Sequence, residues 1–276
     1  MSDARPVHDE VPHDELPHDE LWATTTGVPG AVHIVLVHGS LDRSAGMTKL
    51  SRRLEDRFRV TRYDRRGYGR SLPHAGPFGI DAQVDDLVQV IASAPDAPTP
   101  CIVFGHSYGG NVALATAERH PELVAGVVAY ETPLSWLPWW PGSTAGADAR
   151  AWEHDPAGAA ERFMRRLIGD ARWERLPQAT RDARRAEGEA LVGELGDLSR
   201  AAPWSPEHVH VPVLAMRGEL GPAHHEQGMG VLAGWFGTRL VTIPGAHHFG
   251  PNTHPDEVAA AVSEFASRAI TRAAGD

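Results

Sequence analysis

Cysteine is almost absent from this sequence, since Cys101 is the one thiol among 276 residues. A single thiol cannot form an intramolecular disulfide, so a reducing compartment fits the chain. Basic residues are also in the minority, with 26 Lys and Arg against 36 Asp and Glu and a formal net charge of −10. This balance argues against nucleic acid or an anionic membrane surface as the main partner.

Long hydrophobic runs are absent as well. Apolar runs such as Val32–Val37 and Val124–Tyr130 are far shorter than the roughly 20 residues that span a bilayer. The segment Met1–Glu20 is acidic and has no apolar stretch of the kind found in signal peptides. We therefore expect a cytoplasmic protein without a membrane span. Its 42% of hydrophobic residues are enough for a sizeable core.

The first 22 residues are expected to form a disordered acidic tail. The triplet His-Asp-Glu occurs three times at a period of five residues, as His8–Glu10, His13–Glu15 and His18–Glu20. This period, combined with repeated proline, matches neither helix nor strand. The triplets could bind a divalent metal adventitiously, but the composition favours a solvated tail. We predict no specific metal site in the chain.

From about Ala31 the chain alternates between short apolar runs and longer amphipathic stretches. The runs are continuously apolar or β-branched, which is typical of strands covered on both faces. Their alternation with helices predicts an α/β fold with a mostly parallel central sheet and flanking helices. The predicted strands are Val32–Val37, Phe58–Tyr63, Cys101–Gly105, Ala125–Tyr130, Pro212–Arg217 and Arg239–Ile243, and the predicted helices are Met47–Asp56, Asp81–Ala92, Asn111–Arg119 and Asp256–Arg272.

This alternation breaks between residues 133 and 208. The stretch begins with three tryptophans amid prolines and continues with charged segments of helical character, Glu161–Ile168 and Thr180–Leu195. We expect a helical cap over residues 133–208, inserted into a core made of residues 23–132 and 209–276. Insertions of this kind often shape an active site.

The sequence Gly105-His106-Ser107-Tyr108-Gly109 matches the pattern G-x-S-x-G between a predicted strand and a predicted helix. A serine at such a turn needs a strained backbone, and flanking glycines allow close approach without Cβ clashes. The helix N-terminus would offer the backbone N–H of Tyr108 to a developing oxyanion. We predict that Ser107 is a nucleophile, with a tight structural turn as the alternative.

Two further segments follow predicted strands. His38-Gly39-Ser40 ends the first strand, and the backbone N–H of Ser40 is expected to be the second oxyanion donor. An ordinary strand-terminating turn is the alternative there. A histidine in the segment Pro244–Phe249, after the last strand, could serve as a general base.

Together these segments resemble the α/β-hydrolase superfamily, and specifically its capped branch of esterases, haloperoxidase-like enzymes and haloalkane dehalogenases. The resemblance covers most of the chain from Ala31, while the cap matches only in position. The matching stretches are His38-Gly39, Tyr63–Ser71, the motif around Ser107, and Pro244–Phe249 followed by His254-Pro255.

The resemblance implies roles for several residues. Because the family's catalytic histidine usually lies three residues after the glycine and before a phenylalanine, it corresponds to His248, with His247 as the less favoured neighbour. Asp64 and Arg65, in the second matching stretch, are expected to stabilise a turn.

The acid of the catalytic triad departs from the family's commonest pattern. Most relatives have Gly-x-x-Asp after the strand predicted at Pro212–Arg217, but Gly221 stands in the aspartate position of this chain. Glu219 is a substitute at that turn. Dehalogenase-like members place the acid after the preceding strand, where this chain has Glu131. We favour Glu131, since a carboxylate there can accept the Nδ1–H of the histidine; a dyad without an acid is the third alternative.

The nucleophile separates the branches, because dehalogenase-like and epoxide-hydrolase-like relatives carry Asp where this chain has Ser107. A serine implies an acyl-enzyme, and therefore cleavage of a carboxylic ester, thioester or amide. Trp136, Trp139 and Trp140 would either line an apolar substrate pocket or pack the cap on the core.

We therefore predict a serine hydrolase that cleaves an ester or thioester of a small, mainly apolar molecule. It needs no cofactor and no partner beyond that substrate, and a homodimer is compatible with the sequence. Cofactor-independent haloperoxidase or carbon–carbon bond hydrolase activity, and a non-catalytic ligand-binding role, are the alternatives.

Overall fold

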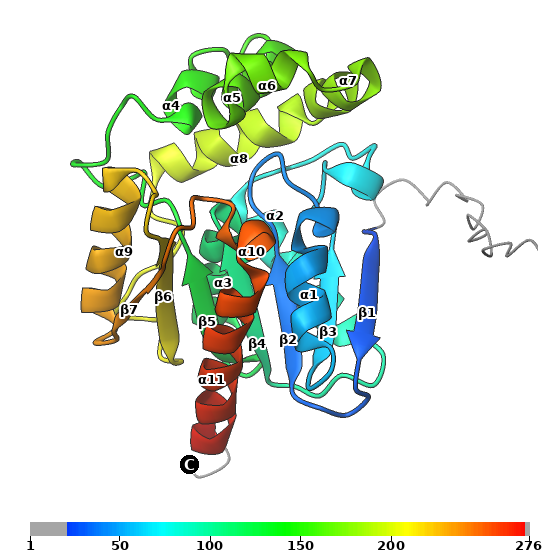
Figure 1. Cartoon of the computed structure of the whole chain (residues 1–276), viewed down its shortest axis with the longest axis vertical. Helices are drawn as coiled ribbons and strands as arrows, with labels where there is room; N and C mark the ends of the chain where they lie inside the picture. Colours follow the sequence, from blue (N-terminus) through cyan, green and yellow to red (C-terminus); the bar gives the residue numbers. More distant parts are fainter. Residues whose placement is uncertain (1–20, 274–276) are drawn as a thin grey trace, which may run out of the picture.

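A mixed sheet forms the centre of the chain, of which the computed structural model describes residues 21–273. Within these residues seven strands form one sheet in the order β1-β3-β2-β4-β5-β6-β7 (Figure 1). β1 pairs antiparallel with β3, and the other neighbouring pairs in this sheet are parallel. The predicted α/β fold with a mostly parallel sheet is confirmed. The strands are β1 (Ala23–Gly27), β2 (His33–Val37), β3 (Arg59–Tyr63), β4 (Cys101–His106), β5 (Val124–Tyr130), β6 (Val213–Gly218) and β7 (Leu240–Ile243).

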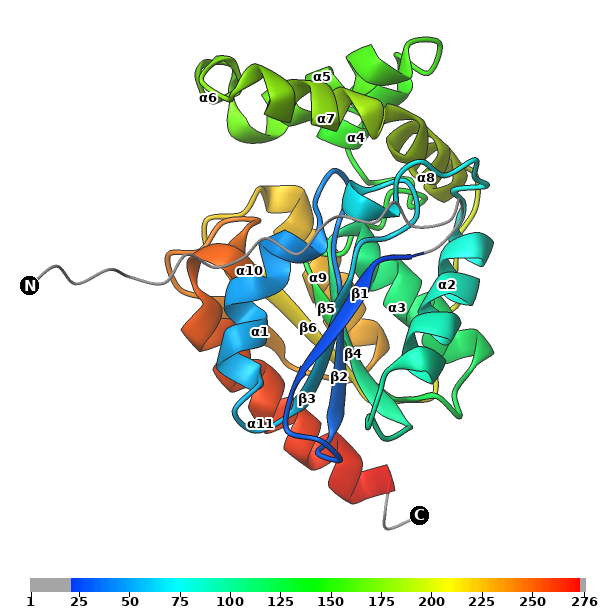
Figure 2. The ribbon, with the colours of Figure 1, turned by 90° about the vertical axis from the view of Figure 1, so that its right-hand side faces the viewer.

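Helices cover both faces of the sheet, because successive strand residues point to opposite faces. In β2, Ile34 and Leu36 belong to the hydrophobic cluster of α1 and α11, whereas Val35 and Val37 belong to that of α2, α3 and α9. Figure 2 shows α1 and α11 on one side of the sheet and α2 and α3 on the other. These elements are α1 (Thr48–Leu54), α2 (Ile80–Ser93), α3 (Tyr108–Arg119), α9 (Ala223–Trp235), α10 (Gly250–Thr253) and α11 (Pro255–Ala273), with 3₁₀ turns at Ser44–Met47 and Gly69–Ser71.

A second helical layer lies beyond the carboxyl ends of the central strands β4 and β5 (Figures 1 and 2). It lies between β5 and β6 in the chain, within the range where the sequence predicts an inserted cap. Phe163, Trp173 and Leu191 are the centre of its own hydrophobic cluster, which Leu41 and Tyr68 of the core complete. Its helices are α4 (Ala145–Arg150), α5 (Pro156–Ile168), α6 (Asp170–Glu174), α7 (Gln178–Ala186) and α8 (Gly188–Arg200).

Three elements of the core, β1, α9 and the single turn α10, are absent from the sequence prediction. β1 has the sequence ATTTG and lies at the edge of the sheet, so it lacks the apolar run of the central strands. α9 contains three glycines, which lower helix propensity. One of them, Gly228, lies where a Cβ would be only 3.1 Å from the ring of Trp140. Close packing on a tryptophan therefore explains a glycine that weakens the helical pattern.

The segment Thr180–Leu195, predicted as one helical stretch, forms two helices that meet at Glu187. Glu187 is fully buried and accepts hydrogen bonds from the Arg43 side chain and the Gly69 N–H. A Cβ at the next residue, Gly188, would lie 2.0 Å from the Pro156 carbonyl oxygen. The helix therefore breaks where Glu187 and Gly188 make tertiary contacts, which the helical periodicity of the sequence does not reveal.

The predicted tail, residues 1–22, lies outside the described residues except for its last two. Leu21 packs against the main hydrophobic cluster. The N–H of Trp22 donates to Ser71 Oγ at 3.0 Å, and the Arg70 guanidinium lies 3.0 Å from the centre of the Trp22 ring. Leu21 and Trp22 therefore belong to the folded core, and the predicted tail extends two residues too far. No helix in the described part of the chain is long and apolar enough to cross a membrane.

Candidate active site

Ser107 lies at the sharp turn between β4 and α3, with φ 54° and ψ −125°. A non-glycine residue in this region is strained by about 1–3 kcal/mol. The flanking glycines are needed for contact between chain segments: a Cβ at Gly105 would lie 2.4 Å from the Gly109 carbonyl oxygen, and one at Gly109 would lie 2.3 Å from the Val37 carbonyl oxygen. The G-x-S-x-G spacing therefore follows from close backbone packing on both sides of the serine.

Backbone hydrogen bonds hold this turn in place. The Ser107 N–H donates to the Tyr130 carbonyl oxygen at 2.8 Å, and the Gly110 N–H donates to the Ser107 carbonyl oxygen at 2.9 Å. The first bond ties the turn to the end of β5, the strand after which Glu131 follows. Ser107 itself lines a cavity near the ends of the parallel strands, which has a volume of about 720 Å³.

His248 and Glu131 come together at this cavity although 117 residues separate them in the chain. Nδ1 of His248 lies 2.7 Å from Oε2 of Glu131, and Oε1 of Glu131 accepts the N–H of Gly218 at 2.8 Å. Burial alone would raise the pKa of Glu131, but the hydrogen bond and charge of His248 outweigh it and lower that pKa to about 2. Because an ionised carboxylate only accepts hydrogen bonds, Nδ1 carries the proton and Nε2 is left as a base.

The two alternative residues at this site point elsewhere. Oε2 of Glu219 accepts the N–H of Gly245 at 2.8 Å, so this exposed carboxylate closes the turn that precedes the histidine pair. Nδ1 of His247 lies 3.0 Å from the Leu220 carbonyl oxygen. The structure therefore brings His248 and Glu131 together and leaves Glu219 and His247 in contacts with the neighbouring loops.

The expected oxyanion donors lie next to Ser107. Tyr108 is the first residue of α3, so its N–H has no acceptor within the helix. Ser40 lines the same cavity as Ser107. The loop that carries it lies close to the serine, since a Cβ at Gly39 would be 2.8 Å from Ser107 Cβ. Ser40 and Tyr108 therefore both lie beside Ser107, where the sequence predicts the oxyanion donors.

A buried arginine supports the loop that carries Ser40. Arg65 donates to the carbonyl oxygens of His38 and Gly39 at 3.0 and 3.2 Å. The backbone N–H of Arg65 donates to Nε2 of His38 at 2.9 Å, so this nitrogen of the His38 ring is unprotonated and accepts the hydrogen bond. Burial, followed by the charge of Arg65, lowers the pKa of His38 to about 3. Asp64 accepts the backbone N–H groups of Ser44 and Arg70, which agrees with the turn-stabilising interpretation of this pair.

Two histidines at the site were not identified from the sequence. The ring of His225 stacks on His248 at 5.1 Å between centroids, and Nε2 of His106 bonds to the His248 carbonyl oxygen at 2.8 Å. Burial, followed by the charge of His248, lowers the pKa of His106 to about 3 and that of His225 well below its ordinary value. His106 occupies a variable position of the serine motif, and His225 lies in the unpredicted α9, so no sequence pattern singles them out.

His225, His248 and Glu131 also form a potential metal-binding group, since one donor atom from each lies within 4.8 Å of the others. Two imidazoles and a carboxylate are donors that suit zinc. Two of the three residues, His248 and Glu131, are hydrogen-bonded to each other in this structure.

The wall of the cavity comes from the core on one side and from the inserted helices on the other. Trp140 lines the cavity, together with Phe163, Leu167 and Leu195. Trp136 instead packs edge-on against Trp204, with 5.6 Å between centroids. Of the three tryptophans considered from the sequence, Trp140 is the one on the cavity wall.

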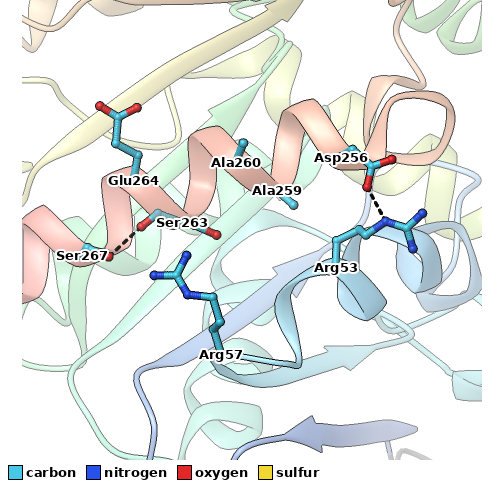
Figure 3. Close-up of a pocket in the computed structure, with 8 residues that line it drawn as sticks. All are labelled: Arg53, Arg57, Asp256, Ala259, Ala260, Ser263, Glu264 and Ser267. Carbon is cyan, nitrogen blue, oxygen red and sulfur yellow. Dashed lines mark hydrogen bonds and ion pairs between the residues drawn. The ribbon is translucent and has the colours of Figure 1, made fainter.

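A second hollow, of about 430 Å³, lies between α1 and α11 (Figure 3). An ion pair between Arg53 and Asp256 bridges the two helices there. The hydroxyl of Ser267 donates to the Ser263 carbonyl oxygen at 2.9 Å, within the helix. Its lining contains no histidine, so the cavity around Ser107 is the candidate active site.

Comparisons with known proteins agree with this fold. The chain matches the alpha/beta hydrolase family over residues 34–261, and it belongs to that family. It is 33% identical to the lipase LipV of Mycobacterium tuberculosis over 102 residues, which is 37% of this chain but only 38% of that lipase. It is 26% identical to a 2-(acetamidomethylene)succinate hydrolase of Mesorhizobium japonicum over 254 residues, 84% of this chain and 87% of that protein.

Solved structures extend the likeness to the whole fold. A thermophilic esterase from Thermogutta terrifontis, 22% identical, superposes with a TM-score of 0.70 over 90% of this chain and 93% of the esterase. At this identity the likeness defines the fold and leaves the reaction to the residues of the site.

Proposed function

We propose that this protein is a serine hydrolase that cleaves a carboxylic ester, or a thioester, of a small molecule. The observation that carries the proposal is that His248, which is hydrogen-bonded to the buried Glu131, lines the same cavity as Ser107, with the serine in a strained turn at the start of α3. Strain of this kind is commonly retained where it positions a reacting group. The family and the relatives support hydrolysis, and the serine supports an acyl-enzyme.

The reaction follows from the roles of these residues. Oγ of Ser107 attacks the ester carbonyl carbon while Nε2 of His248 takes the hydroxyl proton. Glu131 stabilises the imidazolium that forms, and the N–H groups of Ser40 and Tyr108 bind the oxyanion. The imidazolium then protonates the departing alcohol, which leaves the acyl group on Ser107.

Water completes the cycle. Nε2 of His248 removes a proton from water, the hydroxide attacks the acyl carbon, and the bond to Ser107 Oγ breaks as the oxygen regains its proton. The products are the alcohol and the carboxylic acid, so one water is consumed for each ester bond and no cofactor takes part. The apolar wall around Trp140, Phe163 and Leu195 suits a small substrate with apolar parts.

The decisive experiment is covalent labelling with a fluorophosphonate. The wild-type chain should be labelled and should hydrolyse p-nitrophenyl esters, with a preference for one acyl length in a graded series. Ser107→Ala should retain its melting temperature and lose both properties. Label retained on Ser107→Ala would refute the nucleophile assignment, and a folded wild-type protein that takes no label would favour the non-catalytic, ligand-binding alternative.

A further inference from the structure

The side chains that line the cavity around Ser107 include arginines but no carboxylate, although the chain as a whole is acidic and Glu131 lies behind His248. Three arginines from the inserted helices, Arg150, Arg166 and Arg172, line it, and none of its described lining residues is an aspartate or glutamate. The chain as a whole has a net charge of −10. The remaining polar lining residues are serine, threonine and histidine, none of which supplies a negative charge.

These arginines differ from most others in the same helices, which are paired with carboxylates. Arg162 pairs with Asp148, Arg165 and Arg185 with Glu161, Arg181 with Glu174, Arg184 with Glu187, and Arg200 with Asp197. Among the described residues, no carboxylate pairs with any of the three arginines on the cavity wall. In the insertion, most arginines away from the cavity are therefore paired with carboxylates, with Arg175 as an exception, whereas the three on its wall are not.

The two arginines with the clearest free donors are Arg150 and Arg172. Arg150 is partly buried, and burial lowers the pKa of its guanidinium with no carboxylate to oppose the shift. Arg166 donates to the Ser143 carbonyl oxygen, which uses one of its five N–H donors. Arg166 and Arg172 are exposed, so Arg150 is the partly desolvated member of the three. A guanidinium without a counter-ion can form paired hydrogen bonds with a planar carboxylate.

We propose that the ester cleaved at Ser107 carries a carboxylate group, which Arg150, Arg166 and Arg172 bind. The inference depends on the proposed function for the cleavage of an ester. The negative charge of the substrate is inferred from the arginines on the cavity wall. The substrate is then an ester with a carboxylate on its acyl or its alcohol side and an apolar spacer between the two groups: its carboxylate lies against the inserted helices, its spacer lies along the apolar wall, and its ester carbonyl lies at Ser107.

Pairs of esters that differ only in charge test this inference. p-Nitrophenyl hydrogen glutarate is compared with p-nitrophenyl pentanoate for a charge on the acyl side, and 4-acetoxybenzoate with phenyl acetate for a charge on the alcohol side. In at least one pair the charged ester should have the higher kcat/KM, and added salt should reduce this preference. Equal or lower kcat/KM for the charged member of both pairs would refute the inference.

Substitutions identify the binding groups. Arg150→Met and Arg172→Met should each lower kcat/KM for the preferred charged ester by about 10- to 100-fold, while the neutral partner changes little. Arg172 is exposed, so its substitution keeps the test valid if Arg150→Met fails to fold. Arg175→Met is the matched control, because Arg175 is exposed in the same insertion and is not on the cavity wall. Equal losses on charged and neutral esters would contradict the inference.

A binding measurement separates this inference from the proposed reaction. Glutarate should bind to Ser107→Ala, measured by calorimetry at low salt, and bind more weakly when Arg150→Met is added. If the protein binds glutarate but hydrolyses no ester, the carboxylate-binding site is supported and the proposed hydrolase function is refuted. If the protein hydrolyses neutral esters but neither binds glutarate nor prefers charged esters, the proposed hydrolase stands and the carboxylate-binding site is refuted.

Discussion

The candidate site depends on the charge of a single buried residue. Glu131 is fully buried, and its two oxygens accept hydrogen bonds from His248 Nδ1–H and from the Gly218 N–H. Its backbone is also strained, with φ 46°, as are those of Ser107 and of Leu41 next to Ser40. Strained residues thus cluster around the cavity, where surrounding contacts hold side chains in positions that the chain alone would not adopt.

The first prediction concerns the role of this carboxylate. Glu131→Gln should lower kcat by roughly 10³–10⁴-fold, because an amide no longer selects the histidine tautomer and no longer stabilises the imidazolium. Glu219→Gln is the matched control and should leave kcat nearly unchanged, since Glu219 accepts a backbone N–H in an exposed turn. A large loss in the control, with Glu131→Gln active, would transfer the role to Glu219.

The second prediction concerns pH. The pKa of Glu131 in the folded protein is about 2, below its ordinary value of 4.5. Its interactions therefore stabilise the fold fully above about pH 4.5 and are lost as the pH falls towards 2. The difference in the free energy of unfolding between wild type and Glu131→Gln, measured in urea, should shrink from about pH 6 to about pH 3. A difference that does not vary with pH would mean that Glu131 is not an ionised partner.

At the scale of elements, the turn between β4 and α3 sets the position of Ser107, the proposed nucleophile. It fits against the end of β2 only because Gly109 has no side chain: a Cβ there would approach the carbonyl oxygens of Val37 and His38 to 2.3 and 2.7 Å. Backbone atoms in the middle of a sheet cannot move away easily. The glycine is therefore a requirement of packing between two elements, in addition to its place in the motif.

The third prediction tests this contact. Gly109→Ala should destabilise the fold by about 1–3 kcal/mol, as overpacking does, and should reduce ester hydrolysis by displacing Ser107. The control is Gly230→Ala in α9, where a Cβ would meet nothing within 4 Å. Because alanine favours a helix over glycine, the control should be stabilised by about 0.5–1 kcal/mol. Both values come from urea unfolding, and a neutral Gly109→Ala would contradict the packing argument.

At the scale of the whole molecule, a buried ion pair joins the inserted helices to the core. Glu194 of α8 accepts from the Arg65 guanidinium at 2.8 Å and from the Tyr68 hydroxyl at 2.7 Å, and the side chains of Arg65 and Glu194 are fully buried. Arg65 also holds the carbonyl oxygens of His38 and Gly39. The position of the loop that carries Ser40 is thus coupled to the docking of the inserted helices.

The fourth prediction follows from this coupling. Glu194→Gln leaves the Arg65 charge buried without its partner and should cost about 3–5 kcal/mol of unfolding free energy. Replacing both residues, Arg65→Met with Glu194→Leu, should recover part of that loss, because no buried charge is left unpaired, while the carbonyl oxygens of His38 and Gly39 and the Tyr68 hydroxyl lose their partners. The control is Glu264→Gln in the exposed pair with Arg268, which should cost less than about 1 kcal/mol. Similar losses for Glu194→Gln and Glu264→Gln in urea unfolding would contradict the coupling.

The sequence by itself determined the features that depend on local pattern. Apolar or β-branched runs predicted the six parallel strands, of which β2, β4, β5 and β6 are buried along their whole length. The shift from strand to helix located the turn of Ser107. The spacing of the family's motifs predicted His248 as the base and favoured Glu131 as its acid partner. The edge strand β1 and the glycine-containing α9 lacked these patterns, because an edge position and close packing on Trp140 select residues that periodicity does not recognise.

Only the tertiary structure decided which carboxylate meets His248. Glu131 and Glu219 both follow strands that end at the same edge of the sheet, so the sequence leaves either one within reach of the histidine. The backbone turn at Glu131 directs its side chain to His248, while Glu219 closes the turn at Gly245. The charge of the cavity wall was likewise decided in three dimensions, because it depends on which arginines find carboxylate partners among helices far apart in the chain.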